Sequence, residues 1–98
     1  MDRQAIIERL RAGEFDLRAR GVVHAALFGS RARGDNPADS DIDIMIEIEP
    51  EKTPDLYAYV GLKSYIAALF PEPVDVVDRN GLKPFIKPVV ESEALYAF

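Results

Sequence analysis

The clearest pattern in the chain is the alternation of residues 41–49, in which isoleucine occupies every even position and only Met45 interrupts the polar residues at the odd ones. Because successive side chains of a strand point to opposite faces, this pattern predicts a half-buried β-strand. The apolar runs 22–28 and 74–77, both rich in valine, predict two further strands. The stretch 29–40 is rich in Gly, Asp, Arg and Ser and predicts a loop with room for a short helical turn.

A second rhythm, with apolar residues three or four positions apart, predicts helices over residues 3–20 and 55–70. Gly13 interrupts the first helix and predicts a break near Glu14, and the prolines after residue 70 end the second. A third helix around residues 82–90 is expected to be short or bent because it contains two prolines. Residues 91–98 are expected to dock through their apolar side chains. The two apolar stripes comprise Ile6, Ile7, Leu10 and Leu17 in the first helix and Leu56, Tyr59, Leu62, Ile66, Leu69 and Phe70 in the second.

This order of elements predicts an α/β (α+β) fold, with a short mixed β-sheet and helices packed on one face. The helices would cover the isoleucine side of the central strand and leave an open acidic face on the other side. A chain of 98 residues has room for one hydrophobic core, so residues 1–98 are expected to form a single domain.

The charge balance narrows the classes of partner. There are 12 Lys and Arg against 17 Asp and Glu, for a net charge of −5. Proteins that coat nucleic acid rely on Lys and Arg contacts to phosphates, so we expect no direct nucleic-acid binding. No apolar run approaches the roughly 20 residues of a membrane span, and the first residues lack the apolar stretch of a signal peptide. The expected location is therefore the cytoplasm, without membrane contact.

Cysteine is absent and His24 is the only histidine. This composition excludes disulfides, thiolate zinc sites and multi-histidine metal sites. Because His24 falls in the apolar run 22–28, we expect it to be a hydrogen-bonded structural residue of that strand.

Carboxylates are the first candidates for chemistry. Asp41 and Asp43 project from the same face of the central strand, with Cα atoms about 6.5–7 Å apart. Two carboxylates this close resist joint ionisation unless a cation lies between them, and Mg²⁺ prefers such oxygen ligands. The same row continues with Glu47 and Glu49. On this pattern alone, a solvated acidic face is the favoured interpretation.

Gly29 and Ser30 directly follow the first strand. Such a corner exposes backbone N–H groups and a hydroxyl that can hold a terminal phosphate, although an ordinary turn with a serine cap has the same sequence. Arg31 and Arg33 could neutralise phosphate charge or pair with aspartates of the same loop.

Asp75 supplies a third carboxylate, within the predicted strand 74–77. If Val74 and Val76 face the core, Asp75 faces the open side. If that strand lies beside the central one, the three acids converge. Three acids and a phosphate-holding corner on a strand scaffold are what two-metal phosphoryl or nucleotidyl transfer requires.

The spacing of these parts resembles a known family. Gly-Ser, ten residues, Asp-x-Asp and an acid on a later strand are similar to the DNA polymerase β-like nucleotidyltransferase superfamily. The string GSRARGDNPADSDIDI of residues 29–44 closely resembles its minimal nucleotidyltransferase (MNT) branch. Residues 74–77 resemble the third-acid strand of that branch and residues 82–98 its usual ending, so the resemblance covers essentially the whole chain.

The resemblance implies roles for individual residues. Ser30 would contact the triphosphate of ATP, and Gly29 would allow its close approach. Asp41 and Asp43 would ligate Mg²⁺ in a two-metal site. Asp75 would be the third acid, as a metal ligand or general base. Arg31 and Arg33 lie in the matching string and would contact the nucleotide.

The resemblance also implies a partner. Minimal nucleotidyltransferases of the MntA type are antitoxins that pair with HEPN-domain toxins and transfer AMP from ATP to a toxin tyrosine. The implied function is thus that of a protein adenylyltransferase antitoxin in a hetero-oligomer. One alternative is an antitoxin that neutralises by binding alone. Another, less favoured because such enzymes generally carry extra helices or a second domain, is a nucleotidyltransferase that modifies a small molecule.

Overall fold

The computed structural model describes all residues, 1–98. It contains one mixed sheet of four strands in the order β3-β2-β1-β4. The central strand β2 (Ile42–Ile48) runs antiparallel to β1 (Val22–Phe28) and parallel to β3 (Val74–Asp78). The edge strand β4 (Leu95–Tyr96) runs antiparallel to β1. The three predicted strands and the mixed sheet are confirmed, and β4 is an additional strand.

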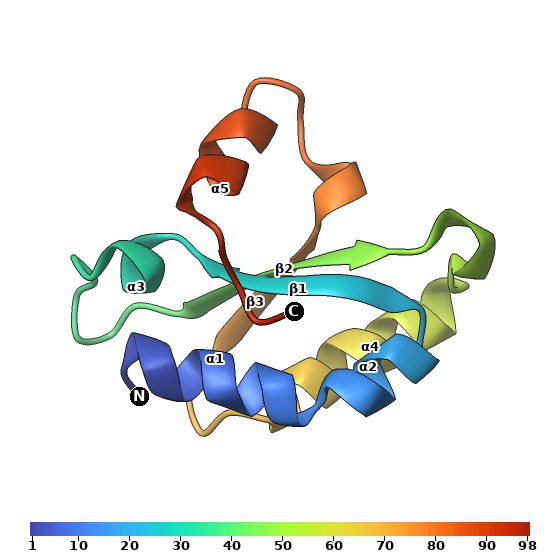
Figure 1. Ribbon diagram of the computed structural model, residues 1–98, viewed down its shortest axis with the longest axis horizontal. Helices are drawn as coiled ribbons and strands as arrows, with labels where there is room; N and C mark the ends of the chain where they lie inside the picture. The colour runs from blue at the N-terminus through green and yellow to red at the C-terminus, as the bar shows by residue number, and fades with distance from the viewer.

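Three helices cover the isoleucine face of this sheet: α1 (Arg3–Ala12), α2 (Glu14–Ala19) and α4 (Leu56–Ala68) (Figure 1). The predicted break occurs at Gly13, which ends α1 and precedes α2. Asp2 and Asp55 cap α1 and α4 by accepting hydrogen bonds from backbone N–H groups, each at 2.8 Å. The core beneath the sheet contains the four even-numbered isoleucines of β2 together with the helix stripes, among them Ile6, Leu10, Leu17, Leu62 and Ile66.

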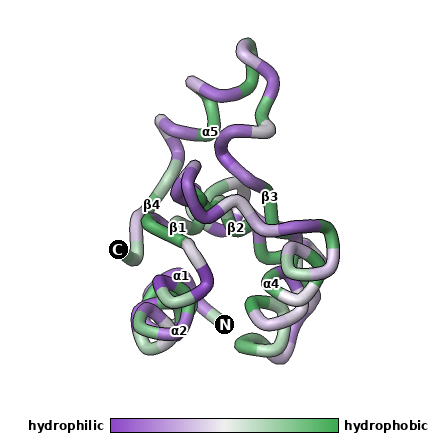
Figure 2. The backbone as a smooth tube through the Cα atoms, turned by 90° about the vertical axis from the view of Figure 1, so that its right-hand side faces the viewer, coloured by the Kyte–Doolittle hydropathy of each residue, from purple (hydrophilic) through white to green (hydrophobic).

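The last helix, α5 (Lys87–Glu93), lies on the other side of the sheet (Figure 2). Its Val90 packs with Met45 of β2 and Ala26 of β1 in a small second cluster. This contact explains why an apolar residue interrupts the polar positions of β2. The open face is therefore divided, because α5 covers its middle and leaves the stretch with Asp43 on one side.

The predicted start of the last helix was wrong. Residues 82–86 lie outside α5, after the short 3-10 helix η2 (Arg79–Gly81), and α5 begins only at Lys87. Pro88 lies in the first turn of α5, where a missing N–H removes no helical hydrogen bond. None of the helices combines the length and apolar character that crossing a membrane would require.

The C-terminal residues dock as predicted. Leu95 and Tyr96 pair with Leu27 and Ala26 of β1. The ladder continues as the Ala97 N–H donates to the Ala25 carbonyl at 2.9 Å.

Two residues expected inside the fold lie at its surface. Leu56 is 76% exposed because it begins α4, and only later turns of that helix pack on the core. His24 is exposed on the face of the sheet opposite α1, α2 and α4, in a part that α5 does not cover. Its ring and the Tyr96 ring pack edge to face, with their centroids 6.0 Å apart. The expectation of a hydrogen-bonded structural histidine was therefore wrong, because the His24 ring makes no hydrogen bond and its Nε2 lies 3.6 Å from Oε2 of Glu47.

Candidate active site

Two acidic residues lie side by side on the face opposite the isoleucines. Asp43 of β2 and Asp75 of β3 are direct partners in the parallel ladder, where neighbouring strands are about 4.8 Å apart. Asp43 is half-buried and Asp75 is exposed. Asp41 is exposed just before β2 begins. The strand of the third acid thus lies beside the central strand, as convergence requires.

The Gly29 corner closes directly onto Asp43. Gly29 precedes the short helix α3 (Ser30–Arg33) and has φ 76° and ψ −157°, a conformation that residues with a Cβ rarely adopt. A Cβ at this position would collide with Oδ2 of Asp43 and lie 3.2 Å from its Cγ. The Gly29 carbonyl accepts hydrogen bonds from Ala32 and Arg33 at 3.1 Å each, which starts α3 at Ser30. Glycine here thus permits both the turn and the approach to the carboxylate.

The pKa of Asp43 reflects its burial and the nearby acids. Burial raises the pKa of Asp43, and the charges of Asp75 and then Asp41 raise it further, against smaller opposing effects of Arg33 and Arg31. A cation would relieve this crowding.

The acids do not form a ready-made metal cage, because no group of three or more His, Asp or Glu residues is arranged to hold an ion. Mg²⁺ is commonly held by one or two carboxylates together with water and substrate phosphates. The donor set on this face therefore fits a magnesium ion that binds together with a nucleotide.

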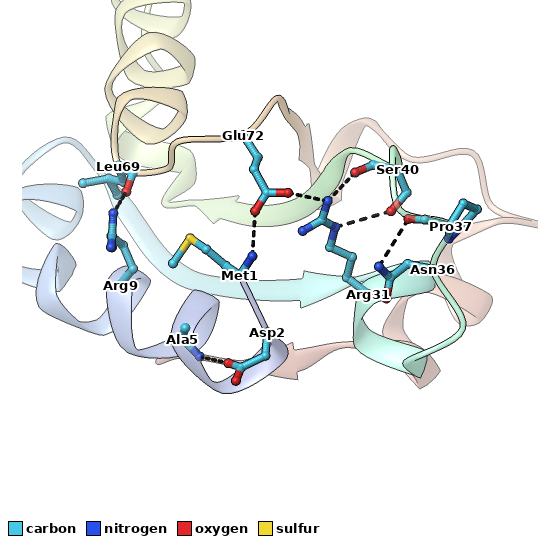
Figure 3. Close-up of polar contacts among 10 residues, drawn as sticks. All are labelled: Met1, Asp2, Ala5, Arg9, Arg31, Asn36, Pro37, Ser40, Leu69 and Glu72. Atoms are coloured by element: carbon cyan, nitrogen blue, oxygen red, sulfur yellow. Dashed lines mark hydrogen bonds and ion pairs between the residues drawn. The ribbon is translucent and has the colours of Figure 1, made fainter.

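Both candidate arginines are occupied by groups of this chain. Arg31 is buried, with 6% exposure, and donates to the Ser40 carbonyl at 2.5 Å and to Glu72 at 2.8 Å (Figure 3). Arg33 is exposed and donates to Asp35 at 3.1 Å and to Glu93 of α5 at 2.7 Å. Pairing with Asp35 follows from the sequence. Pairing with Glu72 or Glu93 could not be predicted from the local sequence, because each glutamate lies far along the chain from its arginine.

The acids stand on an open surface. None of Asp41, Asp43 and Asp75 lines any of the three surface cavities. One of these cavities, of about 340 Å³, lies at the other end of β2 and β3, between Ile48, Asp78 and the start of α4. A small molecule would find little enclosure at the acids, whereas a protein surface could cover them.

Comparison with known proteins shows the family of this chain. The family model described as nucleotidyltransferase domain matches residues 11–97. Protein adenylyltransferase MntA of Thermococcus cleftensis is 38% identical over 88 residues, covering 89% of this chain and 87% of the relative. A chain of Methanocaldococcus jannaschii named as a protein adenylyltransferase is 35% identical over 76 residues, covering 76% of each chain.

Solved structures share the fold. A structure described as that of a minimal nucleotidyltransferase has a TM-score of 0.70 and 33% identity, covering 97% of this chain and 95% of its own. A chain from a toxin–antitoxin crystal structure with AMP-PNP has a TM-score of 0.69 and 24% identity, with coverages of 90% and 72%. A chain from a structure of a tri-AMPylated Shewanella oneidensis HEPN toxin in complex with its MNT antitoxin has a TM-score of 0.64 and 21% identity, with coverages of 94% and 71%. The chain belongs to the nucleotidyltransferase domain family, as a minimal nucleotidyltransferase of the MntA type.

Proposed function

We propose that this chain is a protein adenylyltransferase antitoxin, which transfers AMP from ATP to a tyrosine of a HEPN-domain toxin. Its relatives named as protein adenylyltransferases support the reaction class. The fold it shares with chains from toxin–antitoxin structures, one with AMP-PNP and one with an AMPylated HEPN toxin, supports ATP and the partner. Residues 1–98 would form one domain that works in a hetero-oligomer in the cytoplasm, where ATP is available.

The observation that carries the proposal is the closure of the Gly29 corner onto Asp43, beside Asp75, on an open face. In the proposed reaction Gly29 and Ser30 hold the triphosphate through backbone N–H groups and the serine hydroxyl. Asp41 and Asp43, with Asp75, would hold two magnesium ions. Magnesium bound there would neutralise the triphosphate and lower the pKa of the attacking hydroxyl.

In the proposed reaction the tyrosine hydroxyl loses its proton and pyrophosphate is the leaving group. The tyrosine oxygen attacks the α-phosphorus, a new P–O bond forms, and the bond to pyrophosphate breaks. Asp75 is exposed at the edge of the acidic cluster and would serve as a metal ligand or as the general base that accepts the tyrosine proton. Pyrophosphate then leaves from the corner at Gly29. Arg33 is exposed and would be the arginine that contacts a phosphate, in place of its present ion pairs with Asp35 and Glu93.

The open site favours a protein acceptor. Because no cavity encloses the acids, the partner must supply the other wall of the site. The net charge of −5 suits a basic partner that handles RNA, so this chain itself needs no contact with nucleic acid.

The test is transfer of label from [α-³²P]ATP, with Mg²⁺, to a HEPN-domain toxin, which is to be sought in a reading frame adjoining the gene of this chain. Label should appear on a toxin tyrosine, disappear with EDTA and return with added Mg²⁺. Asp41→Asn and Asp43→Asn should each abolish transfer. The matched control is Glu49→Gln, which removes a carboxylate near the opposite end of the same strand.

Transfer that survives both aspartate substitutions would refute the assigned site. Neutralisation of the toxin in cells by the double variant, with no label transferred, would favour the alternative of an antitoxin that acts by binding alone.

A further inference from the structure

One buried side chain connects the three segments that carry the candidate site. Arg31 belongs to α3, which begins at the Gly29 corner. Its Nη2 donates to the carbonyl of Ser40 at 2.5 Å, and its Nε donates to the Ser40 hydroxyl at 3.3 Å (Figure 3). Ser40 immediately precedes Asp41. The same Nη2 donates to Glu72 at 2.8 Å, in the turn that leads into the strand of Asp75.

The surroundings of Arg31 show that these contacts are a fixed part of the fold. It is the only charged residue among the buried residues, with 6% exposure. A buried guanidinium is tolerated only when its donors are paired, and no buried polar side-chain atom of this protein lacks a partner. The second oxygen of Glu72 accepts a hydrogen bond from the Met1 ammonium at 2.7 Å.

The ion pair persists at neutral pH. Hydrogen bonds from Arg31, and then from the Met1 ammonium, lower the pKa of Glu72 to about 2, so Glu72 is charged under cellular conditions. Only arginine can serve here, because its planar group presents donors in several fixed directions. Lysine, with one charged nitrogen, cannot reach Ser40 and Glu72 with the same geometry.

We propose that Arg31 is a positioning residue, which holds the Gly29 corner, the strand of Asp41 and Asp43, and the strand of Asp75 in register without touching the nucleotide. The inference replaces the nucleotide contact expected of Arg31 from the sequence. Its consequence for catalysis rests on the proposed function. The alignment of the three segments does not, and it can be measured separately.

The test compares Arg31→Lys and Glu72→Gln with the control Arg79→Gln. Arg79 also binds two carboxylates, Glu47 of β2 at 2.5 Å and Glu91 of α5 at 2.8 Å, but toward the other end of β2 from Asp43. Glu72→Gln is the milder variant because it keeps a carbonyl acceptor, so it serves if Arg31→Lys does not fold.

The first readout is amide hydrogen exchange of the full chain, measured by mass spectrometry. Both site-side variants should speed exchange together in residues 29–34, 40–43 and 72–76, whereas Arg79→Gln should leave these segments unchanged. Faster exchange confined to α3, or the same pattern in the control, would overturn the proposal. This readout decides the alignment even if the wild-type chain transfers no AMP, which would refute the proposed function alone.

The second readout is the kinetics of AMP transfer. Misplacement of reacting groups by about 1 Å can cost roughly a hundredfold in rate. We expect Arg31→Lys and Glu72→Gln each to lower kcat by about tenfold to a hundredfold, with KM for ATP changed by less than about threefold. The double variant should lose about as much as either single one, because the two residues act as a unit. A rise in KM for Arg31→Lys, with Glu72→Gln unaffected, would instead assign Arg31 to the nucleotide.

Discussion

Alanine at Gly29 tests the close approach of backbone to carboxylate on which the candidate site depends. Gly29 has φ 76° and ψ −157°, and a Cβ there would collide with Asp43. Gly34 at the other end of α3 is a matched control. Its φ of 85° and ψ of 11° also lie in the left-handed region, but no atom lies within 4 Å of the position of its Cβ.

Gly29→Ala and Gly34→Ala should differ in lost stability, because only the Cβ at position 29 collides with another residue. Gly34→Ala adds left-handed backbone strain of about 1–2 kcal/mol. Gly29→Ala adds strain of about 1–3 kcal/mol and overpacking of about 1–3 kcal/mol, for a total of about 2–6 kcal/mol. For a chain of this size, each kcal/mol lowers Tm by roughly 4–8 °C. Gly29→Ala should therefore lower Tm by roughly 10 °C or more, about twice the effect of Gly34→Ala.

Activity should separate the two variants further. Gly29→Ala forces the Asp43 carboxylate aside and should lower AMP transfer by about a hundredfold. Gly34→Ala should stay within about twofold of the wild type. Thermal unfolding and label transfer to the HEPN protein, the latter at a temperature where both variants are folded, measure these effects. Equal losses of Tm, with both variants active, would refute the reasoning about the Gly29 contact.

Three further predictions concern charge and packing. Because burial and then the charges of Asp75 and Asp41 raise the pKa of Asp43, the folded wild type loses stability as pH rises through that pKa. Asp43→Asn should thus raise Tm at pH 7 in metal-free buffer while abolishing transfer, and a lower Tm would contradict this. The pKa of Glu72, about 2 against an ordinary 4.5, means that its stabilisation is complete above pH 4.5 and is lost as pH falls towards 2. The Tm difference between wild type and Glu72→Gln should shrink over that interval, and a difference independent of pH would count against the ion pair. Ile66→Ala, at a fully buried position, should cost about 2–5 kcal/mol by urea denaturation, and a loss below about 1 kcal/mol would exclude it from the core.

The elements that could be predicted from the sequence are those in which one face is buried, because their apolar residues then recur at a regular spacing. The isoleucines of β2 face the helices and produce a period of two, and the stripe from Ile6 to Leu17 produces the helical one. The start of α5 has no such regular spacing, because only Val90 of that helix is buried, where it packs on Met45 of β2. β4 consists of Leu95 and Tyr96 alone, too short for any period to show.

Some features of the candidate site could likewise be predicted from the sequence, and others could not. The spacing of Gly29, Asp41, Asp43 and Asp75 could be recognised because it resembles the nucleotidyltransferase motif. Strand geometry alone predicted only that Asp41 and Asp43 share a face. The contact of Arg31 with Glu72 joins residues 41 positions apart and arises only when α3 and the turn before β3 meet. No local rule distinguishes such an arginine from one that awaits a phosphate.

The two faces of β2 have a consequence for how this protein can change over evolution. Its even positions hold the fold together, and the odd position Asp43 bears the proposed chemistry. Replacing Asp43 leaves every isoleucine contact in place and removes an unfavourable charge. A chain that has lost catalysis would therefore keep its shape and its partner-facing surface. An antitoxin that modifies its toxin and one that only occupies it can thus be separated by a single residue, with no intermediate that fails to fold.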